Sequence, residues 1–266
     1  MARKTETEPS QIAETVKTIV WAAVIAVGIR TFAYEPFSIP SGSMVPTLLI
    51  GDYLFVSKTA YGYSRFSFPW GIVPIEGRIW EDKPERGDVV VFRPPGEPQT
   101  DFIKRVIGLP GDRIQVREGV LHINGTAVKR ERIEDFVDPG KYYGGTYLQY
   151  IETLPEGVSH RIIEKNDFGP GDNTPTFVVP EGHYFMMGDN RDGSADSRAL
   201  KYGVEANGDS EITDQALFDK VGFVPLENMI GPAKVLFWSY SSDFELTNPI
   251  TWVTALRWRR LGNLVE

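Results

Sequence analysis

The chain has 266 residues, of which 41% are hydrophobic and 24% charged, enough for one well-packed domain or a domain with a large insertion. Its net charge of -8 argues against a nucleic-acid partner, whose phosphates demand clustered Lys and Arg. The absence of cysteine excludes disulfides, thiolate catalysis and thiolate metal sites. The 19 prolines and 26 glycines favour a β-rich chain with many turns, because both residues interrupt long helices.

An uncharged apolar segment lies near the N-terminus, between Lys17 and Arg30. Residues 18–29 alone fall short of the roughly 20 residues that span a bilayer as a helix. Residues 16–34 reach that length if the flanking cationic side chains extend toward the interfaces. We therefore predict a transmembrane anchor over residues 16–34, preceded by a tail over residues 1–15. A buried core helix and a cleaved secretory signal remain open as alternatives.

The charges that flank this segment predict its orientation. Arg3, Lys4 and Lys17 precede it, whereas no Lys or Arg occurs between Arg30 and Lys58. The positive-inside rule then places the N-terminal tail in the cytoplasm and the rest of the chain on the opposite side of the membrane.

The remainder of the chain is predicted to be mainly β. Three segments rich in β-branched and aromatic residues and bounded by Gly or Pro are typical of strands: residues 53–56, 88–92 and 102–107. Residues 119–125 contain the turn dipeptide Asn124-Gly125, which predicts a hairpin.

Four further segments are less clear from their patterns. Residues 130–180 are polar and weakly periodic, which indicates an insertion with long loops, and residues 201–220 are typical of a surface excursion. Residues 66–73 form an apolar stretch that is either a core strand or a lip touching the membrane. The Trp- and Arg-rich residues 252–260 predict either an amphipathic interfacial helix or a terminal helix packed on the domain.

A turn of small residues follows the apolar segment at residues 41–47 (SGSMVPT). Gly42 and Pro46 favour a constrained turn over a strand interior, so the hydroxyl of Ser43 can be held exposed. The turn taken alone is equally typical of an ordinary surface loop.

Lys104 lies within the apolar segment 102–107 (FIKRVI). The period of two along a strand places Phe102, Lys104 and Val106 on one face. Burial among apolar side chains lowers the pKa of a lysine, and the neutral amine can then act as a general base. The alternative is a lysine that extends into solvent from an edge strand.

The densest polar cluster is residues 188–198 (GDNRDGSADSR). Neither possible calcium-loop frame has the glycine and glutamate that an EF-hand requires. The three histidines, His122, His160 and His183, do not form a zinc-binding pair, and no Gly-x-Ser-x-Gly motif surrounds Ser43. We therefore expect neither a histidine triad nor a metal or other cofactor.

Five segments, in their order along the chain, together resemble bacterial signal peptidase I. They are residues 34–53 (YEPFSIPSGSMVPTLLIGDY), 86–92 (RGDVVVF), 102–112 (FIKRVIGLPGD), 184–198 (YFMMGDNRDGSADSR) and 221–233 (VGFVPLENMIGPA). Five matching motifs in order are far more specific than any one of them. Residues 199–220 depart from the resemblance, since this stretch is longer than the family leads us to expect.

The resemblance implies a mainly β fold, with one N-terminal transmembrane helix ahead of a signal-peptidase-like catalytic β core. Residues 35–113 and 181–266 would form the core, and residues 114–180 an inserted β subdomain. The resemblance also implies a single-pass protein of the bacterial inner membrane, with its N-terminus in the cytoplasm and its catalytic core on the outer face.

The resemblance further implies the roles of the matching residues. Ser43 corresponds to the nucleophile, and Lys104 to the general base that takes its proton. The oxyanion hole would combine the backbone N–H of Ser43 with the hydroxyl of Ser41.

Three residues of the polar cluster match supporting positions of the family. Ser194 corresponds to a serine that orients the lysine, while Asp196 and Arg198 correspond to a supporting ion pair. The substrate side chains near the cut are expected to lie against Phe37, Ile39, Pro40, Met44 and Ile103.

The implied function is that of a membrane-bound serine endopeptidase that removes signal peptides from exported preproteins after small-x-small sites. Its expected partners are those signal peptides and the lipid bilayer, and no nucleic acid. A self-cleaving, repressor-type Ser–Lys peptidase would need an N-terminal DNA-binding domain, where this chain has an apolar helix. A membrane-anchored scaffold that kept the peptidase fold without its activity is disfavoured by the intact Ser43, Lys104 and Ser194.

Overall fold

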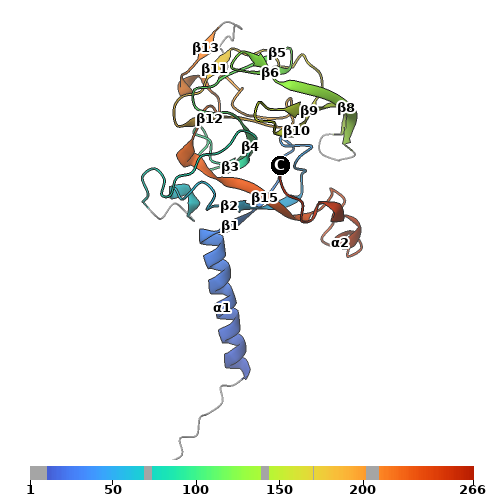
Figure 1. Ribbon diagram of the computed structural model, residues 1–266. Helices are drawn as coiled ribbons and strands as arrows, with labels where there is room; N and C mark the ends of the chain where they lie inside the picture. The colour runs from blue at the N-terminus through green and yellow to red at the C-terminus, as the bar shows by residue number, and fades with distance from the viewer. Residues whose placement is uncertain (1–10, 69–73, 139–143, 170, 202–209) are drawn as a thin grey trace, which may run out of the picture.

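A computed structural model describes residues 11–68, 74–138, 144–169, 171–201 and 210–266 of the chain (Figure 1). Within these ranges one long helix, α1 (Gln11–Phe32), extends away from a body made mostly of β-strands. The predicted fold class, mainly β with one N-terminal apolar helix, is confirmed.

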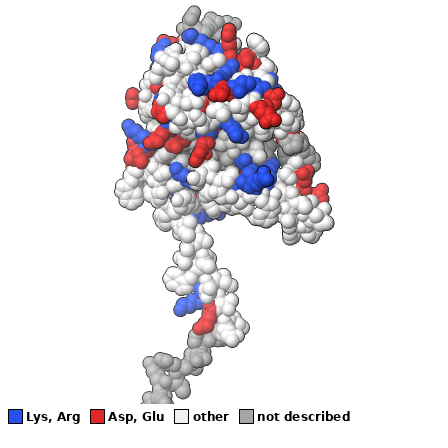
Figure 2. Space-filling model, turned by 45° about the vertical axis from the view of Figure 1, so that its right-hand side comes forward, with Lys and Arg blue, Asp and Glu red and all other residues white. Residues whose placement is uncertain are grey.

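Helix α1 is long and apolar enough to cross a membrane. No residue of α1 is buried against the body, and its most apolar window has a mean hydropathy of 1.8. Its 22 residues at about 1.5 Å each give a length of about 33 Å, close to the thickness of a bilayer's hydrocarbon core. Figure 2 shows few charged side chains on the helix and many on the body. Among the described residues the helix covers Gln11–Phe32, so it already includes residues ahead of the predicted start at Val16, and it ends at Phe32 rather than Tyr34.

The largest sheet has seven strands in the order β1-β2-β15-β3-β4-β12-β14. All neighbouring strands in it run antiparallel. In sheet order the strands are β1 (Tyr34–Ser38), β2 (Asp52–Ser57), β15 (Met229–Ser239), β3 (Val89–Phe92), β4 (Phe102–Gly108), β12 (His183–Met187) and β14 (Val224–Pro225). The strands predicted at residues 53–56, 88–92 and 102–107 correspond to β2, β3 and β4 and are confirmed.

The middle of this sheet is buried on both faces. All four residues of β3 are buried, with Val89 and Val91 in one apolar cluster and Val90 and Phe92 in another. This alternation follows from the period of two along a strand, and burial on both faces explains the continuous apolar run of β3. The fully buried strand gives β4, its neighbour, a rigid support.

The backbone at the end of α1 is fixed to the body. The last carbonyls of a helix have no partner within the helix. Here the Ala33 carbonyl accepts from Lys58 N at 2.9 Å, and the Arg30 carbonyl accepts from Lys58 Nζ at 3.3 Å. The hydroxyl of Tyr63 donates to the Phe32 carbonyl at 2.5 Å. The helix therefore continues directly into β1, which is anchored on β2.

Two smaller sheets form the rest of the body. One has the order β10-β9-β8, and the other β13-β11-β5-β6-β7. Their strands are β10 (Ser159–Glu164), β9 (Gly145–Thr153), β8 (Lys129–Asp138), β13 (Glu211–Ile212), β11 (Thr176–Val178), β5 (Arg113–Arg117), β6 (Val120–Ile123) and β7 (Thr126–Ala127). The predicted hairpin is confirmed: β6 pairs with β7 across Asn124 and Gly125, which have φ of 53° and 81°.

Residues 130–180 contain regular strands where long loops were predicted. Strand β8 pairs with β9, and β9 with β10. None of the residues of β8 is buried, so its sequence lacks the apolar alternation that identifies a half-buried strand. The polar pattern therefore missed these strands, whereas the described residues between β10 and β11 form a long loop as predicted.

The C-terminal Trp- and Arg-rich segment forms neither of the two helices that were considered. It contains one helical turn, α2 (Thr251–Thr254), and one 3-10 turn, η5 (Trp258–Arg260). Arg260 pairs with the fully buried Asp52 at 2.6 Å, and Arg257 lies 3.7 Å from the same carboxylate. A buried carboxylate needs such partners, and these contacts hold the segment on the body in place of a longer helix.

Two remaining predictions fall partly outside the described residues. Of the apolar stretch at residues 66–73, residues 69–73 are not described, and the part before them includes the 3-10 turn Arg65–Ser67. Of the predicted surface excursion at residues 201–220, residues 202–209 are likewise not described, and β13 lies in the remainder.

Candidate active site

Ser43 lies in a tight turn between β1 and β2. The Val45 N–H donates to the Gly42 carbonyl at 3.2 Å, and the Leu48 N–H donates to the Met44 carbonyl at 2.8 Å. Met44 and Leu48 are fully buried, so their side chains anchor the turn in the hydrophobic core. The predicted constrained turn is present and holds its serine in one place. The expected exposure of Ser43 is wrong, because only 7% of the residue is exposed.

The polar cluster after β12 also holds this turn through hydrogen bonds. The backbone N–H of Asn190 donates to the Ser43 carbonyl at 3.1 Å, and the Asn190 side-chain amide donates to the Gly42 carbonyl at 3.1 Å. Two segments far apart in the sequence thus meet at the serine.

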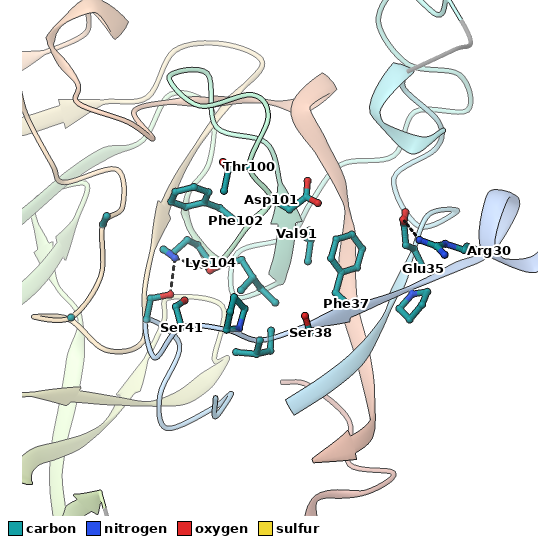
Figure 3. Close-up of a pocket in the computed structure, with 17 residues that line it drawn as sticks. Arg30, Glu35, Phe37, Ser38, Ser41, Val91, Thr100, Asp101, Phe102 and Lys104 are labelled. Carbon is teal, nitrogen blue, oxygen red and sulfur yellow. Dashed lines mark hydrogen bonds and ion pairs between the residues drawn. The ribbon is translucent and has the colours of Figure 1, made fainter. Parts of the chain in front are cut away.

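Lys104, on β4, contacts the hydroxyl of Ser43. Its Nζ lies 2.8 Å from Ser43 Oγ and donates to the Ile103 carbonyl at 2.9 Å. Figure 3 shows the lysine reaching across to the serine turn, with Ser41 and Phe102 nearby. Only 3% of Lys104 is exposed, so the alternative of a solvated edge-strand lysine does not hold.

The environment of Lys104 favours its neutral form. Burial lowers the pKa of this lysine to about 8, although the carboxylates of Asp196 and Asp189 oppose the shift. Burial disfavours the ammonium because it removes water from a charge, and a neutral amine can accept a proton from a hydroxyl. A buried lysine amine beside a serine hydroxyl has the chemistry of a base–nucleophile pair.

Asp196 and Arg198 form the predicted ion pair. Arg198 Nη2 lies 2.9 Å from Asp196 Oδ2, and the same carboxylate accepts from the Gly188 N–H at 3.0 Å. Burial opposes ionisation of Asp196, but Arg198 and the backbone donors hold the pKa of its carboxyl below the usual range. Arg198 also donates to the Arg191 carbonyl at 2.5 Å, so the ion pair joins the two ends of the polar cluster.

Ser194 lies beside the carbonyl of Ser43. Its Oγ is buried and has no hydrogen-bond partner among the residues that the structure describes, so it bonds to neither Ser43 nor Lys104. Both Ser194 and the Ser43 carbonyl lie against Gly188, where a Cβ atom would collide with them. The Ser194 hydroxyl thus lies beside the serine turn without a hydrogen bond to it.

A cavity of about 670 Å³ opens beside Ser43 and Lys104. It is lined by Arg30, Glu35, Pro36, Phe37, Ser38, Ile39, Pro40, Ser41, Ser43, Val91, Thr100, Asp101, Phe102, Ile103, Lys104, Gly193 and Ala195. The structure thus brings Ser41 and four of the five predicted wall residues to one cavity. The fifth, Met44, does not line the cavity and lies in the core.

Arg105 and Asp189 form a buried pair that sequence reasoning missed. Arg105 Nη2 lies 2.8 Å from Asp189 Oδ2, and Thr47 Oγ1 donates to the same oxygen at 2.5 Å. This pair links β4, the serine turn and the polar cluster. The apolar pattern of this strand indicates that Arg105, next to Lys104, is buried. Because a buried arginine needs a carboxylate partner, the sequence could have predicted that such a partner exists.

A second buried pair, Glu152 with Arg191, supports the polar cluster from β9, and no local pattern predicted it. His160 lies between the carboxylates of Glu152 and Asp189, with its Nε2 3.4 Å from Glu152 Oε2 and 3.9 Å from Asp189 Oδ1. Among the residues that the structure describes, no group of three or more His, Asp or Glu side chains is arranged to hold a metal ion.

Comparisons with known proteins identify the family of the chain. A family model described as "Signal peptidase, peptidase S26" matches residues 12–238. The chain belongs to this family. Signal peptidase I of Rickettsia canadensis is 36% identical to it over 265 residues, which cover 92% of this chain and 90% of the relative. Signal peptidase I of Rickettsia typhi is 37% identical over 257 residues, covering 89% and 88%.

Among solved structures, a signal peptidase I from Enterococcus faecalis is 26% identical, with a TM-score of 0.30 over 57% of this chain and 97% of that one. As a signal peptidase, the chain is a peptide-bond hydrolase, and the family acts in removing signal peptides. The resemblance that five sequence segments indicated is confirmed.

Proposed function

We propose that this signal peptidase is a membrane-anchored serine endopeptidase in which Ser43 is the nucleophile and Lys104 the general base. The observation that carries the proposal is the 2.8 Å contact between the buried Lys104 amine and Ser43 Oγ. A serine hydroxyl is a weak nucleophile at neutral pH, and an adjacent base activates it.

The chemistry then proceeds in two balanced steps. Ser43 Oγ attacks the scissile carbonyl carbon while neutral Lys104 takes the hydroxyl proton, and the carbon–nitrogen bond breaks as the lysine returns that proton to the leaving amine. The signal peptide is left as an ester on Ser43. Lys104 next takes a proton from water, whose oxygen attacks the ester carbonyl. The bond from that carbonyl to Ser43 Oγ breaks as the lysine passes the proton to Ser43 Oγ, and this releases the new C-terminal carboxyl group and restores Ser43 and neutral Lys104.

Two donors are proposed to stabilise the negative charge that develops on the carbonyl oxygen. They are the backbone N–H of Ser43 and the hydroxyl of Ser41, which lines the cavity and is exposed. Donors that are already in position are typically worth about 10²–10³ in rate each, because no reorganisation is needed during the reaction.

The cavity supports cleavage after small side chains. Phe37, Ile39, Pro40 and Ile103 give it apolar walls near the serine turn. Strand β1 lies at the edge of the large sheet, so its outer backbone groups can pair with an extended substrate. Shallow apolar walls along such a strand admit alanine-sized side chains at alternate positions, which is the small-x-small pattern of signal-peptide cleavage sites.

The anchor is proposed to place this site at the outer face of the membrane. Lys17 lies in the N-terminal half of α1, and the chain passes from Phe32 directly into β1. The positive-inside rule favours the cytoplasmic side for the N-terminus. The substrate's own apolar segment also lies in the bilayer, so a site close to the membrane suits it.

The test is cleavage of a preprotein in detergent by the wild type, Ser43→Ala and Lys104→Ala, with the products identified by mass. Ser159→Ala and Lys129→Ala are matched controls, since both residues are exposed and lie on the β10-β9-β8 sheet. We expect the wild type and both controls to cut after a small-x-small site and the two site variants to be inactive. Equal activity in all five proteins would show that the chemistry lies elsewhere, and a folded but inactive wild type would favour a scaffold.

A further inference from the structure

The cavity beside Ser43 extends well beyond the apolar walls near the serine. Its lining continues from Pro40 and Ile39 along β1 to Glu35 and reaches Arg30 in the last turn of α1. At about 3.4 Å per residue, the chain from Glu35 to Pro40 spans about 17 Å if it is extended throughout, which matches about five residues of an extended substrate. A small-x-small motif occupies only the half of the cavity nearest Ser43.

At the far end of the cavity, the ion pair of Arg30 with Glu35 is the longest of those that the described residues form there. Glu35 Oε2 is held by the buried amine of Lys58 at 2.9 Å, and Asp101 Oδ1 is held by Arg93 at 2.9 Å. Arg30 Nη2 lies 3.9 Å from Glu35 Oε1, and 65% of the Arg30 side chain is exposed. Each carboxylate thus has a nearer cationic partner than Arg30, and the three groups Arg30, Lys58 and Glu35 leave one net positive charge.

The backbone of Arg30, unlike its exposed side chain, is fixed to the body. Its carbonyl accepts from Lys58 Nζ, and the next two carbonyl contacts at the helix end also fix it to the body. The guanidinium can therefore change partner by side-chain rotation alone, with the strand that forms the cavity wall unmoved. Figure 3 shows Arg30 and Glu35 together at one end of the group of lining residues, on the far side of Phe37 from Lys104.

We propose that the Arg30–Glu35 end of the cavity is a subsite that favours an acidic side chain about five residues before the cut. This inference rests on the proposed function. Arg30 leaves its long contact with Glu35 and pairs with the substrate's carboxylate, while Lys58 keeps Glu35 neutralised. A basic side chain at the same position meets the uncompensated positive charge.

The test uses preprotein substrates that differ only in having Glu, Gln or Lys at the fifth residue before the cut, with the same changes at the fourth and sixth. The kcat/KM values are measured in a nonionic detergent and compared as ratios within each enzyme variant. We expect the wild type to cut the Glu substrate about two- to fivefold better than the Lys substrate, the usual worth of a partly exposed ion pair. The ratio should fall toward one in high salt, which screens exposed charges.

Arg30→Gln should abolish this preference and Arg30→Glu should reverse it. Lys17→Gln, which removes a cation from α1 away from the cavity, is the matched control and should keep the wild-type ratio. A wild-type ratio of one with normal cleavage would overturn the subsite, and so would a preference that survives Arg30→Gln.

A further comparison in phospholipid vesicles separates substrate recognition from a contact between Arg30 and lipid. If Arg30→Gln slowed all substrates equally there and left the ratio unchanged, Arg30 would serve the bilayer and the subsite would be refuted. Failure of every substrate to be cut by the wild type would instead refute the proposed function, so the two outcomes are distinguishable.

Discussion

Glu152 on β9 holds the guanidinium of Arg191 in a buried pair, with Arg191 Nη1 2.9 Å from Glu152 Oε1. Burial opposes ionisation of Glu152, but the adjacent Arg191 keeps the pKa of its carboxyl below the usual range. Asn190, next to Arg191, donates to the Ser43 carbonyl. The β10-β9-β8 sheet therefore supports the loop that holds the serine turn.

We expect Glu152→Gln to destabilise the protein by about 3–5 kcal/mol, because it leaves the charge of Arg191 buried and unpaired. The same change should lower kcat through the misplaced loop. Denaturant unfolding and cleavage kinetics measure the two effects. Glu131→Gln, on the exposed side of β8, is the control and should have little effect on either. Wild-type stability in Glu152→Gln would contradict this role of the pair.

Gly188→Ala should greatly reduce cleavage. A Cβ at this position would collide with the Ser194 side chain and the Ser43 carbonyl, so the serine turn or the polar loop must shift. A displacement of about 1 Å at a catalytic group can cost on the order of 100-fold in rate. Gly28→Ala in α1 is the control, since an added Cβ there would meet no described atom within 4 Å apart from its chain neighbours and the nearby backbone of the helix. Comparable kcat values for the two variants would show that the close approach at Gly188 is unimportant.

Ser194→Ala should separate catalysis from stability. The Ser194 hydroxyl is buried and has no hydrogen-bond partner within the described part of the chain, so removing it should leave the free energy of unfolding within about 0.5 kcal/mol of the wild type or raise it. If the hydroxyl orients Lys104 when substrate binds, kcat should nevertheless fall by about tenfold or more. Thermal unfolding and kcat measured on the same preparation test both statements. An unchanged kcat would exclude the orienting role that the family resemblance implies.

The sequence predicted elements best where one face or both faces of a strand are apolar. Strands β2, β3 and β4 were predictable because burial imposes a readable hydrophobic pattern. Strand β8 was not, because none of its residues is buried and its backbone pairing with β9 leaves no trace in side-chain hydrophobicity. The C-terminal segment was misjudged for a different reason, since its arginines are held by the distant Asp52.

The candidate site was predictable where its chemistry is local to a motif. Ser43 and Lys104 lie in two short segments whose residue types indicate a turn and a buried strand, and the structure brings them together. Glu152 and Thr47 were missed because their partners lie far away in sequence, at Arg191 and Asp189, and only the folded chain reveals these distances.

Cleavage should rise with pH through the titration of Lys104. The amine acts as a base only when neutral, and burial lowers its pKa to about 8, so most molecules are inactive at pH 6 and most are competent above pH 9. Values of kcat/KM between pH 5 and 10, measured with a substrate that does not titrate in this range, should decrease about tenfold per pH unit on the acid side. A rate that stays flat down to pH 5 would refute a lysine base.

The buried position of Lys104 also has a cost in stability. Its pKa falls from an ordinary 10.5 to about 8 in the folded chain, and a difference of this size corresponds to about 3 kcal/mol. Below pH 8 both the folded and the unfolded chain carry the proton, so the folded state bears the full cost of a buried ammonium. Between pH 8 and 10.5 the folded chain loses the proton first, and the cost disappears as the pH rises.

Lys104→Met should therefore yield an inactive protein that is more stable than the wild type at pH 7. Methionine fills a similar volume without a charge, and most of the cost of the buried ammonium, on the order of 1–3 kcal/mol, is then recovered. Thermal unfolding of both proteins at several pH values measures the difference, which should shrink steadily between pH 8 and 10.5. Lys129→Met, at an exposed position on β8, should show no such pH-dependent gain. A Lys104→Met variant that is less stable at pH 7 than the wild type would mean that the ammonium is well accommodated, and the argument for a neutral base would lose its physical support.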